Sequence, residues 1–213
     1  MSKFRNNNIS KFHYITQDVT GLTHAELAEL ACRGGADWVQ LRVKDKNYDD
    51  WKKITIETRK ICKSYNATFI INDNVELAGE IQADGVHLGK EDMHPAKARE
   101  ILGDSYIIGA TANTFEDIQN LTVLKIDYIG LGPFRHTVTK KNINKIIGIE
   151  GFRQILNNCR ASGITIPVIA IGGINTEDIT DLLKTGIYGV AVSSAINLAE
   201  DKTKVTELLL KRL

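Results

Sequence analysis

The stretch Val39–Lys44 reads VQLRVK and places two cations close together among apolar residues. In an extended strand, side chains at alternate positions share a face, so Gln40, Arg42 and Lys44 would point the same way. If the strand lies at a sheet edge, this polar face is solvated and carries no functional meaning. If the strand is buried, its cations require an anionic partner, because an unpaired buried charge is costly. The stretch therefore predicts either an edge strand or a site for an anion.

Asp73 and Asp92 are the candidates for a divalent metal site. They lie at the ends of two adjacent structural units of the chain, and no cluster of histidine and cysteine accompanies them. A few hard oxygen ligands suit Mg²⁺, whose coordination is then completed by water and substrate phosphates. Alternatively, either aspartate caps the helix that follows it. Cations beside a Mg²⁺ site would form a clamp for pyrophosphate.

The elements that would position these residues alternate regularly along the 213-residue chain. The predicted strands are 12–17, 38–44, 68–72, 85–88, 106–110, 128–131, 167–171 and 189–192. The predicted helices are 22–33, 48–64, 75–81, 95–102, 115–124, 149–161, 176–184 and a last helix that ends near 212. This alternation predicts an α/β fold with a parallel sheet and outer helices. Eight units in a chain of this length favour a (β/α)8 TIM barrel.

A doubly wound open sheet is the alternative fold, but no GxGxxG motif follows the first strand. We therefore expect one barrel domain over residues 11–213, preceded by a polar tail over residues 1–10. Several helix ends carry their own signals. Thr23 and Glu26 form a capping box, Asn47 and Thr114 are N-caps, and Pro95 is a first helical residue.

An internal repeat in alternate strands supports the barrel. The second, fourth, sixth and eighth strands share the pattern ADWVQLR, ADGVHLG, IDYIGLG and IYGVAVS. Alternate strands of a barrel fill common interior layers. The aligned repeat predicts a lower layer of Gln40, His87, Gly130 and Ala191, and an upper layer of Arg42, Gly89, Gly132 and Ser193. Three small residues do not fill the upper layer, so Arg42 would point into a cavity, whereas His87 would be a hydrogen-bonded core residue.

The ends of the last two predicted strands carry a candidate phosphate site. Gly172-Gly173 and Ser193-Ser194 follow strands seven and eight, where barrels often bind phosphate through backbone N–H groups. A Gly-Gly pair alone is more often a tight turn, but the Ser-Ser pair at the next strand end favours phosphate. Thr111 adds a hydroxyl group at the end of strand five, and Lys140 adds a cation in the loop after strand six.

The composition excludes several classes of protein. The net charge is +1 with no basic block, which argues against nucleic-acid binding. No apolar run approaches the ~20 residues of a membrane span, and the polar N-terminus lacks the apolar core of a secretory signal. Cys32, Cys62 and Cys159 are widely spaced, as expected of buried thiols in a reducing cytosol. We expect a cytoplasmic protein that acts on small molecules, with the oligomeric state left open.

Seven motifs in order resemble the thiamine phosphate synthase family, whose members join the pyrimidine and thiazole halves of thiamine phosphate. They are VQLRVK (39–44), INDN (71–74), DGVHLGKED (84–92), IIGAT (107–111), YIGLGPFRHTVTK (128–140), VIAIGGI (168–174) and VSSAI (192–196). Each motif alone is weak, but together they span nearly the whole predicted barrel. The resemblance implies a Mg²⁺-dependent transferase in which pyrophosphate leaves first and the thiazole nitrogen attacks the resulting pyrimidine-methyl cation.

The resemblance also implies a role for each matching residue. The pyrimidine diphosphate would be held by Gln40, Leu41, Arg42, Val43, Lys44, Asn72, Thr111 and Lys140, and the catalytic cations would be Arg42, Lys44 and Lys140. The thiazole phosphate would be held by Thr137, Val138, Thr139, Gly173, Ser193 and Ser194. Mg²⁺ would be held by Asp73 and Asp92. Thr111 stands where many family members have serine.

Two alternatives share the same barrel. A TenI-like protein isomerises the thiazole phosphate, and such relatives lose parts of the pyrophosphate and metal sets, which this chain retains. A non-catalytic protein that binds a phosphate ligand would show binding without Mg²⁺-dependent turnover.

Overall fold

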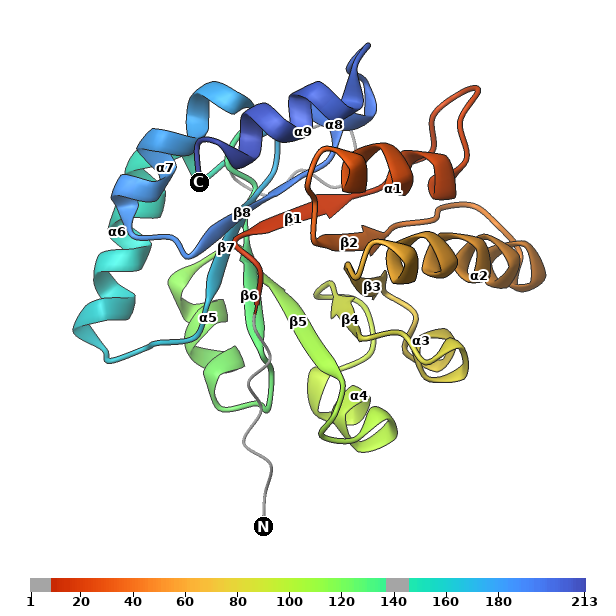
Figure 1. Ribbon diagram of the computed structural model, residues 1–213. Helices are drawn as coiled ribbons and strands as arrows, with labels where there is room; N and C mark the ends of the chain where they lie inside the picture. Colours follow the sequence, from red (N-terminus) through yellow and green to blue (C-terminus); the bar gives the residue numbers. More distant parts are fainter. Residues whose placement is uncertain (1–8, 137–145) are drawn as a thin grey trace.

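The computed structural model describes residues 9–136 and 146–213, in which eight parallel strands close into a barrel (Figure 1). Each strand pairs with its neighbours in sequence, and β8 pairs with β1, so none of the strands that the structure describes lies at an edge. The strands are β1 (Phe12–Ile15), β2 (Trp38–Leu41), β3 (Thr68–Asn72), β4 (Gly85–Leu88), β5 (Ile107–Ala112), β6 (Tyr128–Leu131), β7 (Val168–Ile171) and β8 (Gly189–Val192). The (β/α)8 prediction is confirmed, and the open sheet is excluded.

The helices surround this barrel on the outside, as Figure 1 shows. They are α1 (His24–Arg33), α2 (Tyr48–Ser64), α3 (Val75–Ile81), α4 (Pro95–Leu102), α5 (Phe115–Thr122), α6 (Gly148–Ala161), α7 (Ile179–Thr185), α8 (Ser194–Asn197) and α9 (Lys202–Leu210). A short 3-10 helix, η1 (Thr176–Asp178), precedes α7. The predicted helix 176–184 is therefore two elements, and the C-terminal helical region is divided into α8 and α9.

The residues predicted to cap or open helices do so in the structure. The Thr23 hydroxyl accepts a hydrogen bond from the Glu26 N–H, and the Glu26 carboxylate accepts one from the Thr23 N–H. Asn47 and Thr114 cap α2 and α5 through their side chains, and Pro95 opens α4. The side chains of Thr23, Asn47 and Thr114 satisfy N–H groups that have no partner inside the helix. Because this signal is local, the starts of these helices could be predicted from the sequence.

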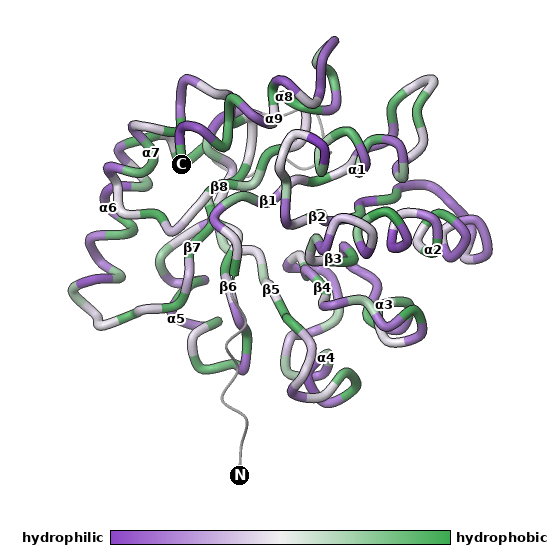
Figure 2. The backbone as a smooth tube through the Cα atoms, in the orientation of Figure 1, coloured by the Kyte–Doolittle hydropathy of each residue, from purple (hydrophilic) through white to green (hydrophobic). Residues whose placement is uncertain are grey.

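The core has two parts, because a parallel barrel buries both faces of its strands. Between strands and helices lies a large apolar layer, to which the outer helices contribute one face. Hydrophobic and hydrophilic residues accordingly alternate along these helices in Figure 2. Inside the barrel lies a second cluster, made of Ile9, Ile15, Trp38, Ile70, Ile107, Tyr128, Ile169 and Ala191.

Ile9 shows that the packed chain begins inside the predicted tail. Its side chain is buried with the interior cluster, and the Ser10 hydroxyl donates to the Asp37 carboxylate at 2.7 Å. Cys32, Cys62 and Cys159 are buried free thiols, as the sequence predicted. Within residues 9–136 and 146–213, no helix is both long and apolar enough to cross a membrane.

Candidate active site

The carboxyl ends of β2, β3 and β4 bring together two cations and two carboxylates. The Lys44 ammonium, after β2, lies 2.8 Å from the Asp73 carboxylate that follows β3. Asp92, in the turn after β4, shares a hydrogen bond with Asp73. Arg42 is close enough for Asp73 to act on its pKa. These four residues come from three neighbouring strands, so barrel closure assembles them at one rim.

Neither aspartate caps a helix, so the alternative role considered for them is excluded. The N-cap of α3 is Asn74, whose side-chain oxygen accepts from the Leu77 N–H at 2.9 Å. The N-cap of α4 is His94. Asp92 instead accepts from the Gly89 N–H at 2.6 Å. Asp73 has a left-handed φ of 69°, a conformation that costs energy for a residue other than glycine and recurs at functional sites.

The two carboxylates compete for one proton. Burial, then the hydrogen bond and the negative charge of Asp73, raise the pKa of Asp92 to about 6. Burial alone would raise the pKa of Asp73 as well. The hydrogen bond with Asp92 and the Lys44 ion pair outweigh burial, and the pKa of Asp73 lies below its usual value. The raised pKa of Asp92 indicates that the two negative charges repel each other despite the Lys44 ion pair, and a bound cation would relieve that repulsion.

This donor set fits Mg²⁺. Two protein carboxylates leave coordination positions for water and substrate phosphate, the arrangement that Mg²⁺ prefers. The part of the chain that the structure describes contains no cluster of three or more His, Cys, Asp and Glu residues able to hold a metal. A metal held by protein ligands alone therefore does not fit here, whereas one shared with a phosphate does.

Arg42 is partly buried at the rim, and its backbone is held from β1. Its N–H donates to the Thr16 hydroxyl at 3.1 Å, and the same hydroxyl lies 2.8 Å from His24 Nδ1. Burial lowers the pKa of Arg42, and the carboxylates of Asp73 and Asp18 oppose that shift. Because β2 pairs on both sides, with β1 and β3, the edge-strand interpretation of this stretch is wrong.

The predicted strand over 38–44 is three residues too long, since β2 ends at Leu41. The N–H of the next residue is bonded to a side chain, not to a neighbouring strand. Leu41 and Val43 are buried in the apolar layer between strands and helices. Only their backbone groups remain for contact with a ligand at the barrel mouth.

Below the rim, several polar side chains lie in the barrel interior together with the apolar cluster. Gln40 Nε2 donates to Asn72 Oδ1 at 3.2 Å, and both side chains are largely buried. His87 lies within hydrogen-bond distance of Thr111 and Tyr128. The prediction of a hydrogen-bonded core histidine is therefore confirmed.

The small residues of the predicted upper layer have individual reasons to be small. A Cβ on Gly89 would lie 2.8 Å from the Asp92 carboxylate. A Cβ on Gly132 would lie 2.3 Å from the Ile171 carbonyl oxygen of β7. The Ser193 hydroxyl donates to the Gln17 side chain at 3.1 Å. Gly89 thus gives space to a proposed metal ligand, and Gly132 allows a close approach of two backbones.

The candidate phosphate site combines the ends of β7 and β8. Gly172 and Gly173 have φ values of 105° and 67°, and a Cβ on Gly173 would lie 2.4 Å from Arg135 Cγ. The tight turn after β7 therefore requires glycine. Ser193 and Ser194 both donate their hydroxyl groups to the Gln17 side-chain oxygen, at 3.1 and 3.3 Å. Four further predicted contacts lie outside the described residues: Thr137, Val138, Thr139 and Lys140.

Gln17 and Thr16 are site residues that the sequence analysis missed. The predicted site residues follow the second to the eighth strand, at the carboxyl ends where barrels carry their sites, and none of them follows the first strand. The same rule applied there would have selected Thr16, Gln17 and Asp18. Asn197 was also missed. It donates to the Ser193 carbonyl at 3.0 Å and accepts from the Tyr14 hydroxyl, but no sequence motif marks it.

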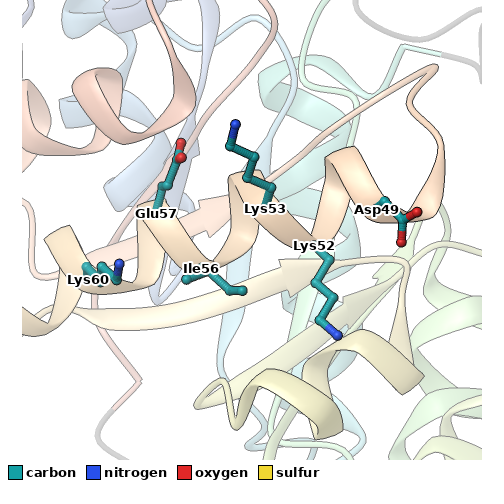
Figure 3. A pocket seen from close by; sticks show the side chains of 6 residues that line it. All are labelled: Asp49, Lys52, Lys53, Ile56, Glu57 and Lys60. Carbon is teal, nitrogen blue, oxygen red and sulfur yellow. The ribbon is translucent and has the colours of Figure 1, made fainter.

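A shallow pocket on the outer face of α2 is a different kind of feature. All of its lining residues belong to that one helix: Asp49, Lys52, Lys53, Ile56, Glu57 and Lys60. Figure 3 shows Lys53 and Glu57 on one side of the helix and Lys52 on the other. Cationic and anionic side chains alternate on this solvated surface. Its side chains all come from one helix, whereas the barrel rim brings together charged side chains from several strands.

The chain is similar to known proteins over most of its length. A Bacteroides fragilis thiamine-phosphate synthase is 43% identical over 197 residues, covering 92% of this chain and 97% of that protein. A Flavobacterium johnsoniae thiamine-phosphate synthase is 45% identical over 204 residues, covering 96% of both. The solved thiamine phosphate pyrophosphorylase from Pyrococcus furiosus matches with a TM-score of 0.84 and 36% identity, over 95% of this chain and 94% of that one. The family model for thiamine monophosphate synthase matches residues 13–196, and this chain belongs to that family.

Proposed function

We propose that this protein is a transferase that joins hydroxymethylpyrimidine diphosphate to thiazole phosphate, giving thiamine phosphate and pyrophosphate. The observation that carries this proposal is the rim cluster of Arg42 and Lys44 beside the Asp73–Asp92 pair. Cations and a site for Mg²⁺ at one position suit a departing pyrophosphate. The family membership supports the same reaction.

In the proposed reaction, the bond between the pyrimidine methylene carbon and the pyrophosphate oxygen breaks first. The bonding electrons leave with pyrophosphate, where Arg42 and Lys44 stabilise the growing negative charge, and Lys140 is proposed to act with them. The lone pair of the thiazole nitrogen then forms the new bond to the methylene carbon. This sequence needs no nucleophilic side chain and no general base. The protein's main task is to hold two substrates in register.

The remaining site residues are proposed to hold the two rings. Gln40, Asn72 and Thr111 line the barrel below the rim, where the pyrimidine would lie. Backbone and hydroxyl groups at the ends of β7 and β8 are proposed to hold the thiazole phosphate, together with the loop after β6. The members of this second set are Gly173, Ser193, Ser194, Thr137, Val138 and Thr139. Leu41 and Val43 would contribute backbone contacts only.

We propose that Asp73 and Asp92 hold Mg²⁺ when substrate is present. The bound ion would neutralise charge on the pyrophosphate oxygens. Composition further supports a cytoplasmic protein with small-molecule partners and no nucleic-acid or membrane partner, because the charge is balanced and no basic block is present.

A coupling assay tests the proposed function. Purified protein with both phosphorylated substrates and Mg²⁺ is expected to release pyrophosphate and thiamine phosphate in equal amounts, measured by chromatography. A TenI-like isomerase would convert only the thiazole phosphate, and a binding protein would retain both substrates unchanged. Absence of thiamine phosphate while both substrates bind would refute the synthase assignment.

Mg²⁺ is expected to stabilise the fold in a pH-dependent manner. The folded-state pKa of Asp92, about 6, lies above the ordinary value of 3.8, so the folded protein binds more protons than the unfolded chain between these values. The contribution of Asp92 to stability therefore falls as pH rises through this window. Above it, Mg²⁺ held by Asp73 and Asp92 would supply the positive charge that the lost proton no longer provides. About 10 mM Mg²⁺ should raise Tm by a few degrees near pH ~7.5 and by much less near pH ~5.

Differential scanning fluorimetry measures this effect without substrates. The Asp92→Asn variant removes one charge of the pair and should show little Mg²⁺ shift at either pH. An equal Mg²⁺ shift in the wild type and in Asp92→Asn would place metal binding elsewhere.

A further inference from the structure

A buried hydrogen-bond chain runs through the barrel interior to the proposed substrate site. The Tyr128 hydroxyl, on β6, lies 3.0 Å from His87 Nδ1 on β4. His87 Nε2 lies 3.1 Å from the Thr111 hydroxyl on β5. Tyr128 and His87 are almost fully buried, whereas Thr111 is partly exposed at the end of its strand. The chain therefore has one end in the core and the other at the barrel mouth.

The direction of this chain follows from the burial of Tyr128. A neutral imidazole has one donor nitrogen and one acceptor nitrogen. Among the described residues, His87 is the hydrogen-bond partner of the Tyr128 hydroxyl. If Nδ1 carried the proton, the Tyr128 hydroxyl proton would be buried without an acceptor, which is unfavourable. Tyr128 is therefore the donor to Nδ1, which places the imidazole proton on Nε2.

That tautomer decides what Thr111 can do. With Nε2–H donating to the Thr111 oxygen, the hydroxyl proton of Thr111 is released from His87 and is directed away from it. In the opposite tautomer, Thr111 would donate to His87 and could only accept from a ligand. The chain thus makes Thr111 a hydrogen-bond donor toward the barrel mouth.

The packing around the two rings shows that this arrangement is built into the barrel. A Cβ on Gly109 would lie 2.1 Å from Tyr128 Cζ, and a Cβ on Gly130 would lie 3.0 Å from His87 Cε1. Two glycines on neighbouring strands therefore leave the space that the rings occupy. On the core side, the His13 ring packs edge-on against Tyr128, with ring centroids 5.0 Å apart. These contacts hold both rings in place before a ligand arrives.

We propose that Tyr128 and His87 are positioning residues that present the Thr111 hydroxyl as a donor to an acceptor atom of the pyrimidine ring. This inference rests on the proposed function for the identity of the ligand. Pyrimidine ring nitrogens are hydrogen-bond acceptors, so they match a donor at this position. Neither Tyr128 nor His87 needs to touch the substrate.

The His87 tautomer is tested first, on the free wild-type protein. Long-range ¹H–¹⁵N correlation spectra of protein labelled at histidine distinguish the Nε2–H from the Nδ1–H tautomer. We expect Nε2–H in the wild type and a mixture in Tyr128→Phe, which keeps the ring but removes the donor. Tyr188→Phe is the matched control, because its hydroxyl donates to the Ile9 carbonyl and takes no part in the chain from Tyr128 to Thr111. An Nδ1–H tautomer in the wild type would overturn the inference, whatever the coupling assay shows.

Substrate affinity provides the second readout. Tyr128→Phe should raise KM for the pyrimidine diphosphate about tenfold, leave KM for the thiazole phosphate unchanged, and lower kcat much less. Thr111→Val should do the same, whereas Thr111→Ser should retain wild-type affinity. If Tyr128 acts through Thr111, the double variant should bind no more weakly than Thr111→Val alone. Fully additive effects, or an unchanged KM in Tyr128→Phe, would overturn the positioning role.

Failure of the proposed function can be distinguished from failure of this inference. Calorimetric titration with the pyrimidine diphosphate alone measures the affinity loss without turnover. Normal binding and the expected variant effects, without thiamine phosphate production, would refute the synthase but retain the donor role of Thr111. Coupling activity together with an unchanged affinity in Thr111→Val would support the synthase and refute the donor role of Thr111. If the wild type does not bind this compound, both proposals are overturned.

Discussion

Arg42→Ala is expected to lower kcat for the coupling reaction about 100- to 1,000-fold, the range found when one donor to a developing negative charge is removed. The guanidinium is partly buried at the rim, where the Asp73 carboxylate acts on it. In that setting it is already oriented before charge develops on pyrophosphate. The free energy of unfolding should change by less than about 1 kcal/mol, because the substitution also removes a partly desolvated charge. Steady-state kinetics and chemical denaturation measure the two quantities.

Arg33→Ala is the matched control for this change. Arg33 lies at the end of α1 that leads into β2, at the opposite end of the barrel from Arg42, and its side chain is 57% exposed in an ion pair with Glu29. We expect its kcat to match the wild type. If Arg42→Ala instead unfolded while each folded molecule retained full activity, Arg42 would be a structural residue.

Asp73→Asn is expected to lower kcat about 100-fold or more and to weaken the dependence of turnover on Mg²⁺. The substitution removes one proposed metal ligand charge and the ion pair with Lys44. Asparagine tolerates the left-handed backbone at φ 69° as well as aspartate does, so backbone strain does not explain the loss. Loss of several kcal/mol of charge stabilisation in the transition state accounts for the size of the effect. Initial rates over a range of Mg²⁺ concentrations measure it.

Asp45→Asn controls for the chemistry and the backbone conformation together. Asp45 also has a left-handed φ, of 53°, and lies exposed in the loop after β2. The same substitution there should leave both kcat and the Mg²⁺ dependence unchanged. Wild-type turnover in Asp73→Asn would remove this carboxylate from the proposed site.

Much of the fold could be predicted, because local signals and the global fold agree in this chain. Helix α2 and strand β3 begin and end where the sequence indicated. Cap residues and apolar stretches act over a few positions, so they can be recognised without knowing what packs around them. The predicted end of β2 was wrong because it depends on contacts with other strands. The alternation of apolar and polar residues continues to Lys44, but strand pairing stops at Leu41. The next backbone N–H, that of Arg42, donates to the Thr16 side chain and not to a neighbouring strand.

Some residues of the candidate site could likewise be predicted from local patterns, and others could not. The repeat in alternate strands and the carboxyl-end rule located Arg42, Asp73 and Asp92, because position on a strand decides which end of a barrel a residue reaches. The same patterns did not find Gln17, whose side chain meets Ser193 and Ser194 only where β1 and β8 close the barrel. Contacts across the closure join residues about 176 positions apart. No local spacing records them.

By itself, the sequence determined the alternating elements, the barrel and the residues at its mouth, since each depends on short-range patterns and on strand direction. Only the tertiary structure decided the roles of site residues that depend on which side chains surround them in space. It showed that neither Asp73 nor Asp92 caps a helix, that Asp73 helps to raise the pKa of Asp92, and that Lys44 pairs with Asp73. It also showed that His87 lies between Tyr128 and Thr111, in space that Gly130 leaves open. Charge, burial and hydrogen bonding depend on distances between strands, which form only when the barrel closes.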